Sequence, residues 1–227
     1  MQNELVTIDF RPGPGRALAF GWKRMKENAL LFFLVALVIA VIDIPSQSQN
    51  YNFTSSDPIK SIHSLLLLAF MILIAPAFNY GADLVFLKGV RGDNVLIKSI
   101  LDGFKCYLNV VLSNLLAFGL VIIGFVAFIF PGIYIACRLV FTSYLVMDED
   151  MDPVAAVEAS WRMTQGHTLK IFLLGILSIF IFLGGILLFI IGVFPALMWI
   201  KSSFAALYLS IQKESAPTET LELDAQE

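Results

Sequence analysis

Residues 130–167 read FPGIYIACRLVFTSYLVMDEDMDPVAAVEASWRMTQGH, and this stretch decides the fold that we expect. It begins with Phe130-Pro131-Gly132, where one apolar segment ends, and continues into a second apolar segment that carries a single charged residue, Arg138. An acidic cluster then separates this segment from an amphipathic stretch that ends at Gly166-His167. The stretch predicts the end of one membrane span, a complete second span, and a surface helix that leads into a third.

The composition of the whole chain has the same character. Of its 227 residues, 58% are hydrophobic and only 15% are charged, and the apolar residues occur in long blocks. A helix needs about 20 apolar residues to cross a hydrocarbon core of roughly 30 Å. We therefore expect an all-α polytopic membrane protein with a single domain over residues 16–212. Its six expected spans are residues 29–44, 62–87, 108–130, 133–147, 169–194 and 196–212.

An amphipathic segment precedes the first, the third and the fifth of the expected spans. They cover about residues 16–28, 93–107 and 153–165, and their helical periodicity predicts helices that lie in the headgroup layer. Outside the membrane domain, we expect the polar lead 1–15 and the acidic tail 213–227 to lack regular structure, because neither carries an apolar face.

The same three segments suggest an internal repeat, because each contains a small residue followed by an aromatic and a basic residue. These triplets are Gly21-Trp22-Lys23, Gly103-Phe104-Lys105 and Ser160-Trp161-Arg162. Each is followed by a span, and each unit then reaches a proline between apolar neighbours, at Pro76, Pro131 and Pro195. This order predicts three copies of an interfacial helix plus a helical hairpin. The alternative is chance similarity among leucine-rich spans.

The distribution of basic residues predicts the topology. If each unit contains two spans, all three amphipathic segments lie on one face, and twelve of the fifteen lysines and arginines lie on that face as well. The positive-inside rule makes this face cytoplasmic, with both termini in the cytoplasm. The twelve are Arg11, Arg16, Lys23, Arg24, Lys26, Lys88, Arg91, Lys98, Lys105, Arg162, Lys170 and Lys213.

Charged residues within spans are the clearest conventional sign of function, because a charge at the centre of a span costs roughly 2.5–3.5 kcal/mol. Arg138 lies seven residues after Pro131, and Asp83 lies seven residues after Pro76. Equal spacing predicts equal depth, and we expect Asp83 and Arg138 to form an intramembrane charge pair. The pair would either specify helix packing or line a transport path.

Nothing in the sequence indicates catalysis, a metal site or a cofactor. The acidic cluster at Asp148-Glu149 lacks the spacing of a calcium loop and predicts a solvated loop with a helix cap. His63 and His167 fall on opposite sides of the membrane in the expected topology and have no ligand partners at suitable spacing. Phosphate-binding loops, nucleophile elbows and paired-histidine motifs are absent from the sequence. We expect a protein that is not an enzyme.

The stretch that decides the fold also resembles a bacterial family of six-span inner-membrane proteins. This family comprises the YciC-like proteins and the membrane domain of some glycerophosphoryl diester phosphodiesterases. The resemblance implies the inner membrane of a prokaryote and a role in envelope or lipid homeostasis, and it implies neither catalytic residues nor phosphodiesterase activity. The signature positions are Pro131, Gly132, Asp148, Glu149, Thr164, Gly166 and His167.

These observations lead to two hypotheses about function. The first is a non-enzymatic scaffold or lipid-associated factor in membrane homeostasis, with anionic headgroups of the cytoplasmic leaflet as partners. The second is a small transporter or lipid-translocating protein that uses proline-broken helices and the charges of Asp83 and Arg138. A second copy or another membrane protein is a further expected partner, and nucleic acid is not. The predicted headgroup contacts are Trp22, Lys23, Arg24, Lys98, Lys105, Trp161 and Arg162.

Overall fold

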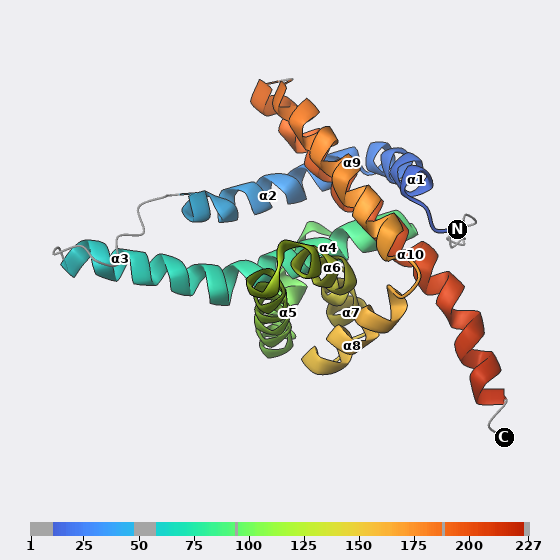
Figure 1. Ribbon diagram of the computed structural model, residues 1–227. Helices are drawn as coiled ribbons and strands as arrows, with labels where there is room; N and C mark the ends of the chain where they lie inside the picture. The colour runs from blue at the N-terminus through green and yellow to red at the C-terminus, as the bar shows by residue number, and fades with distance from the viewer. Residues whose placement is uncertain (1–10, 48–57, 94, 188, 225–227) are drawn as a thin grey trace.

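The computed structural model describes residues 11–47, 58–93, 95–187 and 189–224, and these residues form helices without a strand (Figure 1). Residues 1–10 of the expected lead and 225–227 of the expected tail lie outside the described part. The helices are α1 Pro14–Glu27, α2 Ala29–Gln47, α3 Pro58–Ala69, η1 Phe70–Ile74, α4 Ala75–Arg91, η2 Ile97–Phe104, α5 Tyr107–Ala127, α6 Ile129–Leu139, α7 Thr142–Asp148, α8 Pro153–Met163, α9 Thr168–Leu187 and α10 Phe189–Asp224.

Five helical segments of the described chain are long and apolar enough to cross a membrane, and the bent pair formed by α1 and α2 makes up to six. The prediction of an all-helical chain with several helices long and apolar enough to span a membrane is therefore confirmed. The five segments are Ser61–Arg91, Tyr107–Ala127, Ile129–Asp148, Thr168–Leu187 and Gly192–Ser215.

The chain turns through 99° between α1 and α2. Pro14 lies in the first turn of α1, where its missing N–H costs nothing, and Arg24 and Lys26 complement the helix dipole in the last turn. Asn28 occupies the corner, where its side-chain amide donates to the carbonyl oxygens of Arg24 and Gly89 at 3.4 and 3.3 Å. These bonds attach the corner to α4.

The second span contains the interruption that Pro76 predicts, and the structure shows its form. Proline has no N–H for the helix ladder, and the turn before it, η1, is a π-helix in which the N–H of Ala75 bonds to the carbonyl of Phe70. The side chain of Asn79 donates to the Ala75 carbonyl at 3.2 Å. The wide turn lets α3 and α4 continue as one segment, Ser61–Arg91.

The break between the third and fourth spans differs from the prediction. We expected it at Pro131-Gly132, but Phe128 is the extended residue, and Pro131 lies in the first turn of α6, where it is tolerated. Gly132 packs against α5, since a β-carbon there would lie 2.5 Å from the ring of Phe125. Gly132 therefore allows close packing of the α5–α6 hairpin, and the two helices end and begin at Ala127 and Ile129.

The last helix also differs from the prediction. Pro195 lies inside α10 rather than between two spans, and α9 ends at Leu187 instead of residue 194. α10 continues to Asp224, so residues 213–224 of the predicted irregular tail are helical (Figure 1). Extending an existing helix needs no new nucleus, which is why a polar segment can follow a span without a break.

Two clusters of buried side chains hold the bundle together, and both involve α4 and α10. Tyr208 and Phe141 lie in the larger cluster with residues of α1, α4, α8 and α9, and Phe32 and Phe86 lie in the smaller one with Met198. The remaining helix surfaces expose large apolar side chains, especially on α2, α3, α5 and α9. Such a surface suits a lipid environment.

Candidate functional site

The three small-aromatic-basic triplets lie within α1, at the end of η2 and near the end of α8. In each, the small residue lies where the backbone of its helix approaches another helix. A β-carbon on Gly21 would lie 2.7 Å from Ser203 Oγ, a β-carbon on Gly103 would lie 2.0 Å from the Ala77 carbonyl oxygen, and Ser160 Oγ donates to the Arg138 carbonyl oxygen at 2.8 Å. The small residue of each triplet therefore permits close helix packing.

The aromatic residue of each triplet contacts an aromatic ring on the helix that the small residue of that triplet approaches. The ring centroids are 4.7 Å apart for Trp22 and Trp199, 5.0 Å for Phe104 and Phe78, and 6.0 Å for Trp161 and Tyr134. Each ring pair adds about 0.5–1.5 kcal/mol to the burial of its apolar area. Trp22 and Trp161, which we predicted as headgroup contacts, remain more than a third exposed.

The predicted basic headgroup contacts fall into two groups. Lys23, Lys98, Lys105 and Arg162 are exposed, as a headgroup contact requires. Lys105 donates to Asp102 at 2.7 Å, and this hydrogen bond raises the pKa of Lys105. Arg24 differs from the prediction. Its side chain lies over the ring of Phe20 and is only 12% exposed, because it pairs with Glu27 on the same helix.

The predicted pair of Asp83 and Arg138 is not formed. Asp83 Oδ1 accepts a hydrogen bond from Lys201 Nζ on α10 at 2.6 Å, and the two groups form an ion pair. The prediction assumed that seven residues after a proline means equal depth. Pro76 lies in a continuous helical segment, whereas Pro131 lies in the first turn of a new helix, so the two spacings are not comparable.

Arg138 instead packs against aromatic rings, and it is only 4% exposed. Its guanidinium carbon lies 4.6 Å from the centroid of Trp161 and 5.7 Å from that of Tyr134. These are cation–π distances, and such contacts are worth about 2 kcal/mol when desolvated. The Nε of Arg138 is buried without a hydrogen-bond partner. The charge of Arg138 is therefore stabilised by ring faces and not by a carboxylate.

The backbone of Arg138 explains the signature residue Thr164. α6 ends at Leu139, so the Arg138 carbonyl is one of the last carbonyls of the helix and lacks an intrahelical partner. The hydroxyl of Ser160 on α8 donates to it at 2.8 Å. The hydroxyl of Thr164, the residue that follows α8, bonds to the Ser160 carbonyl at 2.7 Å and lies 3.2 Å from the Arg138 carbonyl. The sequence contains this signal as two hydroxyl residues at positions i and i+4, which we did not interpret.

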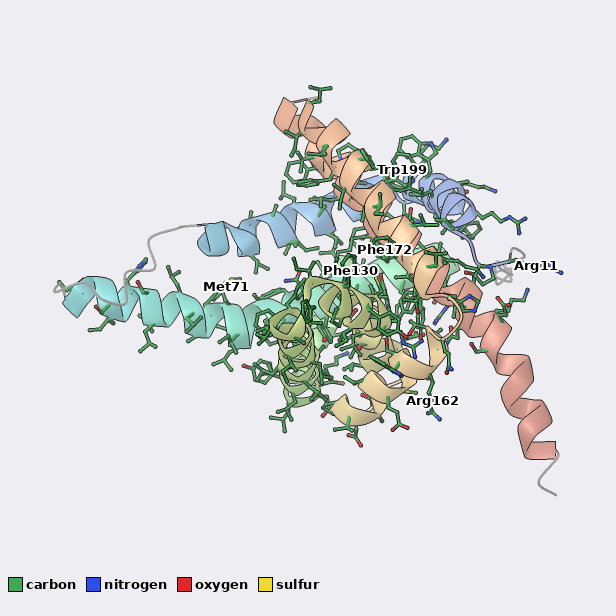
Figure 2. All side chains as sticks on the ribbon, viewed as in Figure 1. Arg11, Met71, Phe130, Arg162, Phe172 and Trp199 are labelled. Carbon is green, nitrogen blue, oxygen red and sulfur yellow. The ribbon has the colours of Figure 1, made fainter. Side chains whose placement is uncertain are left out.

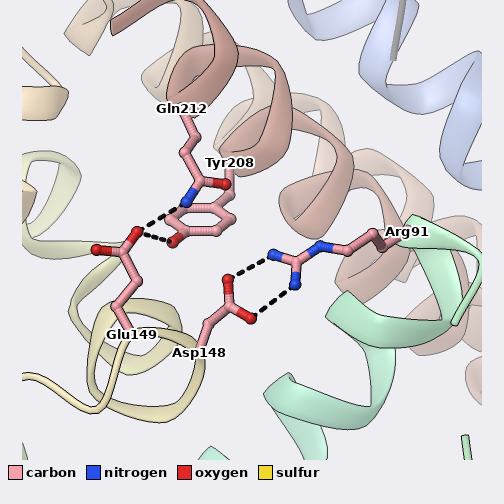
Figure 3. Close-up of polar contacts among 5 residues, drawn as sticks. All are labelled: Arg91, Asp148, Glu149, Tyr208 and Gln212. Atoms are coloured by element: carbon pink, nitrogen blue, oxygen red, sulfur yellow. Dashed lines mark hydrogen bonds and ion pairs between the residues drawn. The ribbon is translucent and has the colours of Figure 1, made fainter. Parts of the chain in front are cut away.

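The acidic signature residues form a polar cluster with α4 and α10, shown in Figure 3. Both guanidinium nitrogens of Arg91 donate to the carboxylate of Asp148, one of them at 2.8 Å. Glu149 Oε1 accepts from Gln212 at 2.7 Å and from the Tyr208 hydroxyl at 3.4 Å. The predicted solvated loop is therefore wrong for Asp148, whose side chain is 9% exposed. The cluster joins α4, α7 and α10.

The last two signature residues follow α8. Gly166 has a φ of 81°, a left-handed conformation that suits glycine at the end of a helix. His167 Nδ1 lies 3.0 Å from Lys170 Nζ, and His167 Nε2 lies 3.8 Å from Glu214. Burial, together with the charge of Lys170, lowers the pKa of His167 despite the opposing effect of Glu214.

An apolar groove of about 320 Å³ lies where α1, α9 and α10 meet. Trp199, at one end of its wall on α10, is labelled in Figure 2. Sequence reasoning missed this groove, although it noted the triplet that contains Trp22. The lining residues are Trp22, Ile181, Gly184, Gly185, Gly192, Pro195, Ala196 and Trp199.

Comparisons with family models, with curated proteins and with solved structures found no match to this chain. The resemblance to the YciC-like proteins therefore stays a prediction. Within the described residues, no three histidine, cysteine or acidic side chains lie close enough together to hold a metal ion.

Proposed function

We propose that this protein is a non-enzymatic integral protein of a prokaryotic inner membrane, and that it binds anionic lipid headgroups of the cytoplasmic leaflet as a scaffold or lipid-associated factor. The observation that carries the proposal is the 99° turn between α1, which exposes Lys23 and Lys26, and the apolar α2. A basic amphipathic helix perpendicular to a span lies in the headgroup layer, where each lysine or arginine contributes about 1 kcal/mol.

The proposal includes three repeated units of an interfacial helix and a hairpin, six spans in all. In support, each triplet packs on the second hairpin helix of a different unit. η2 packs on α4, α8 packs on α6, and α1 packs on α10. Because α1 belongs to the first unit and α10 to the last, these contacts close a ring. The aromatic pairs at all three positions support a repeat over chance similarity among spans.

The ring places the buried charges near the interfacial helices. Arg138 contacts Trp161 of α8, and Lys201 lies between Trp199 and Ser203, which contact α1. Charges at the level of the headgroup layer avoid most of the roughly 2.5–3.5 kcal/mol cost at the centre of a span. Asp83 and Arg138 also have separate structural partners. These contacts support a packing role for the charges over a transport path.

Membership of the YciC-like family is part of the same proposal. Its support is that the signature residues hold the interfacial helices and spans together. Asp148 binds Arg91 between α7 and α4, and Thr164 binds the end of α6. Gly166 allows the turn from α8 into α9.

The composition of co-purified lipid tests the proposal. We expect native mass spectrometry of the detergent-purified protein to show a larger anionic share in bound lipid than in an extract of the same membranes. The triple variant Lys23→Glu, Lys98→Glu, Arg162→Glu removes three exposed positive charges. The anionic share of the lipid bound to this variant should equal the anionic share of the membrane extract. The matched control is Lys23→Arg, Lys98→Arg, Arg162→Lys, which keeps the charges. A wild-type protein with the lipid ratio of the extract contradicts the proposal.

A further inference from the structure

The groove between α1, α9 and α10 has an elongated shape along one helix. Its wall on α10 runs from Gly192 to Trp199, which corresponds to about 10 Å at 1.5 Å per residue. Ile181 and Gly184 contribute the wall on α9. No lining residue is charged, and the volume of about 320 Å³ lies at the lower end of the range for ligand pockets, roughly 300–1,000 Å³.

One end of the groove is aromatic and basic. Trp22 and Trp199 line it, and Lys26 Nζ lies 5.8 Å from the centroid of the Trp22 ring. The indole of Trp199 is held in place because its Nε1 donates to the Leu18 carbonyl oxygen at 2.8 Å. Tryptophan and lysine at one end of an apolar wall are typical of the boundary between headgroups and acyl chains.

Two adjacent glycines have different roles in the groove. A β-carbon on Gly185 would lie 2.7 Å from the Gly192 carbonyl oxygen, so Gly185 sets the close approach of α9 and α10. A β-carbon on Gly184 would meet no atom within 4 Å, so Gly184 leaves the groove hollow without contributing to helix packing. This difference allows the groove to be filled without disturbing the hairpin.

We propose that the groove binds one acyl chain of an anionic phospholipid, with the phosphate of that lipid at Lys26. This inference rests on the proposed function and assigns it a specific site. The occupant follows from the complementary chemistry. The wall is apolar, so water would lack hydrogen-bond partners there, and Lys26, beside the ring of Trp22, supplies a cation that matches a phosphate. The rings of Trp22 and Trp199 lie where the chain meets the headgroup.

The test fills the groove from Gly184. In Gly184→Leu the side chain enters the hollow, whereas in the control Gly175→Leu it enters open space on the opposite side of the same helix. Delipidated protein in detergent is titrated with phosphatidylglycerol and separately with phosphatidylcholine, and bound lipid is counted by native mass spectrometry. We expect wild type and Gly175→Leu to bind one phosphatidylglycerol tightly, and Gly184→Leu to bind it about tenfold more weakly.

The headgroup is tested separately with Lys26→Gln, which should reduce the preference for phosphatidylglycerol over phosphatidylcholine and leave binding of phosphatidylcholine unchanged. Equal binding by Gly184→Leu and wild type would overturn the groove inference while leaving the proposed function intact. A wild-type dimer that Gly184→Leu abolishes would also overturn it, because a second copy would then fill the groove. Equal wild-type affinity for the two lipids would overturn the anionic preference and with it the proposed function.

Discussion

Lys201 of α10 donates a hydrogen bond to Asp83 of α4 across 2.6 Å, and these two residues are 118 positions apart in the sequence. The pair joins α4 to α10. Because Asp83 is buried and Lys201 is 34% exposed, removing one partner leaves a charge that water reaches only in part.

We expect Lys201→Met to destabilise the protein by about 1–3 kcal/mol, less than the ~3–5 kcal/mol of a fully buried pair, because the ammonium group is partly exposed. The double variant Asp83→Leu, Lys201→Met should be more stable than Lys201→Met alone, since it leaves no unpaired carboxylate. Thermal unfolding in detergent measures both. If the losses in stability of Asp83→Leu and Lys201→Met added up to that of the double variant, the ion pair would contribute nothing to stability.

Arg138 should couple energetically to Trp161 and not to Asp83. The guanidinium carbon of Arg138 lies 4.6 Å from the centroid of the Trp161 ring, and this cation–π contact predicts a coupling of about 1–2 kcal/mol in a double-mutant cycle of Arg138→Met and Trp161→Leu. The control cycle pairs Arg138→Met with Asp83→Asn, and these changes should be additive because the two residues have different partners. If only the control cycle showed coupling, Arg138 would interact with Asp83, as the proline spacing predicts, and not with Trp161.

Thr164→Val should cost about 0.5–1.5 kcal/mol in the free energy of unfolding, because the hydroxyl of Thr164 bonds to the Ser160 carbonyl at 2.7 Å and also lies 3.2 Å from the Arg138 carbonyl of α6. The control is Thr168→Val, whose hydroxyl bonds only to a backbone carbonyl one turn earlier. Unfolding in denaturant should show a larger effect at residue 164 than at 168. An equal effect would mean that the contact with α6 adds no stability.

The stability of the protein should decrease when the pH is lowered, in part because of His167. Burial lowers the pKa of His167 in the folded protein, so the unfolded chain binds this proton more readily. The contribution of neutral His167 is therefore complete above the unfolded pKa of about 6.5 and is lost as pH falls toward the lower folded value. Comparing melting temperatures at several pH values between 7.5 and 5 should show a smaller decline in His167→Gln than in wild type.

The exposed His63 supplies the control for this pH dependence. The stability of His63→Gln should decline as wild type does when the pH is lowered, because the side chain of His63 is exposed in the folded protein. If both histidine variants follow the wild-type curve, the acid sensitivity comes from other groups, and the burial of His167 does not affect folding.

The positions of the helices could be predicted from the sequence because hydropathy and helical periodicity are local properties. α1, α8 and the apolar segments fall close to the predicted ranges for this reason. The break at Phe128 was not predictable in the same way, because no local marker distinguishes this phenylalanine from its neighbours. Pro131 is a strong marker, but a proline is compatible with both the end of one helix and the first turn of the next.

The candidate site was predictable only in part. The helices α1 and α8, which carry Trp22 and Trp161, could be predicted because an amphipathic pattern is local. The partners Lys201 for Asp83 and Arg91 for Asp148 depend on which helices pack together, and their separations of 118 and 57 residues give no sequence signal. The groove depends on the same packing, since its walls come from three helices.

The packing of α1 against α10 has a consequence for biosynthesis. The indole of Trp199 bonds to the carbonyl of Leu18, 181 residues earlier, and Ser203 lies against Gly21. A ribosome makes α1 first among the described helices and α10 last, so α1 lacks its packing partner until nearly all of the chain has been translated. A nascent chain that stops before Trp199 contains α1 but lacks the residues of α10 against which α1 docks.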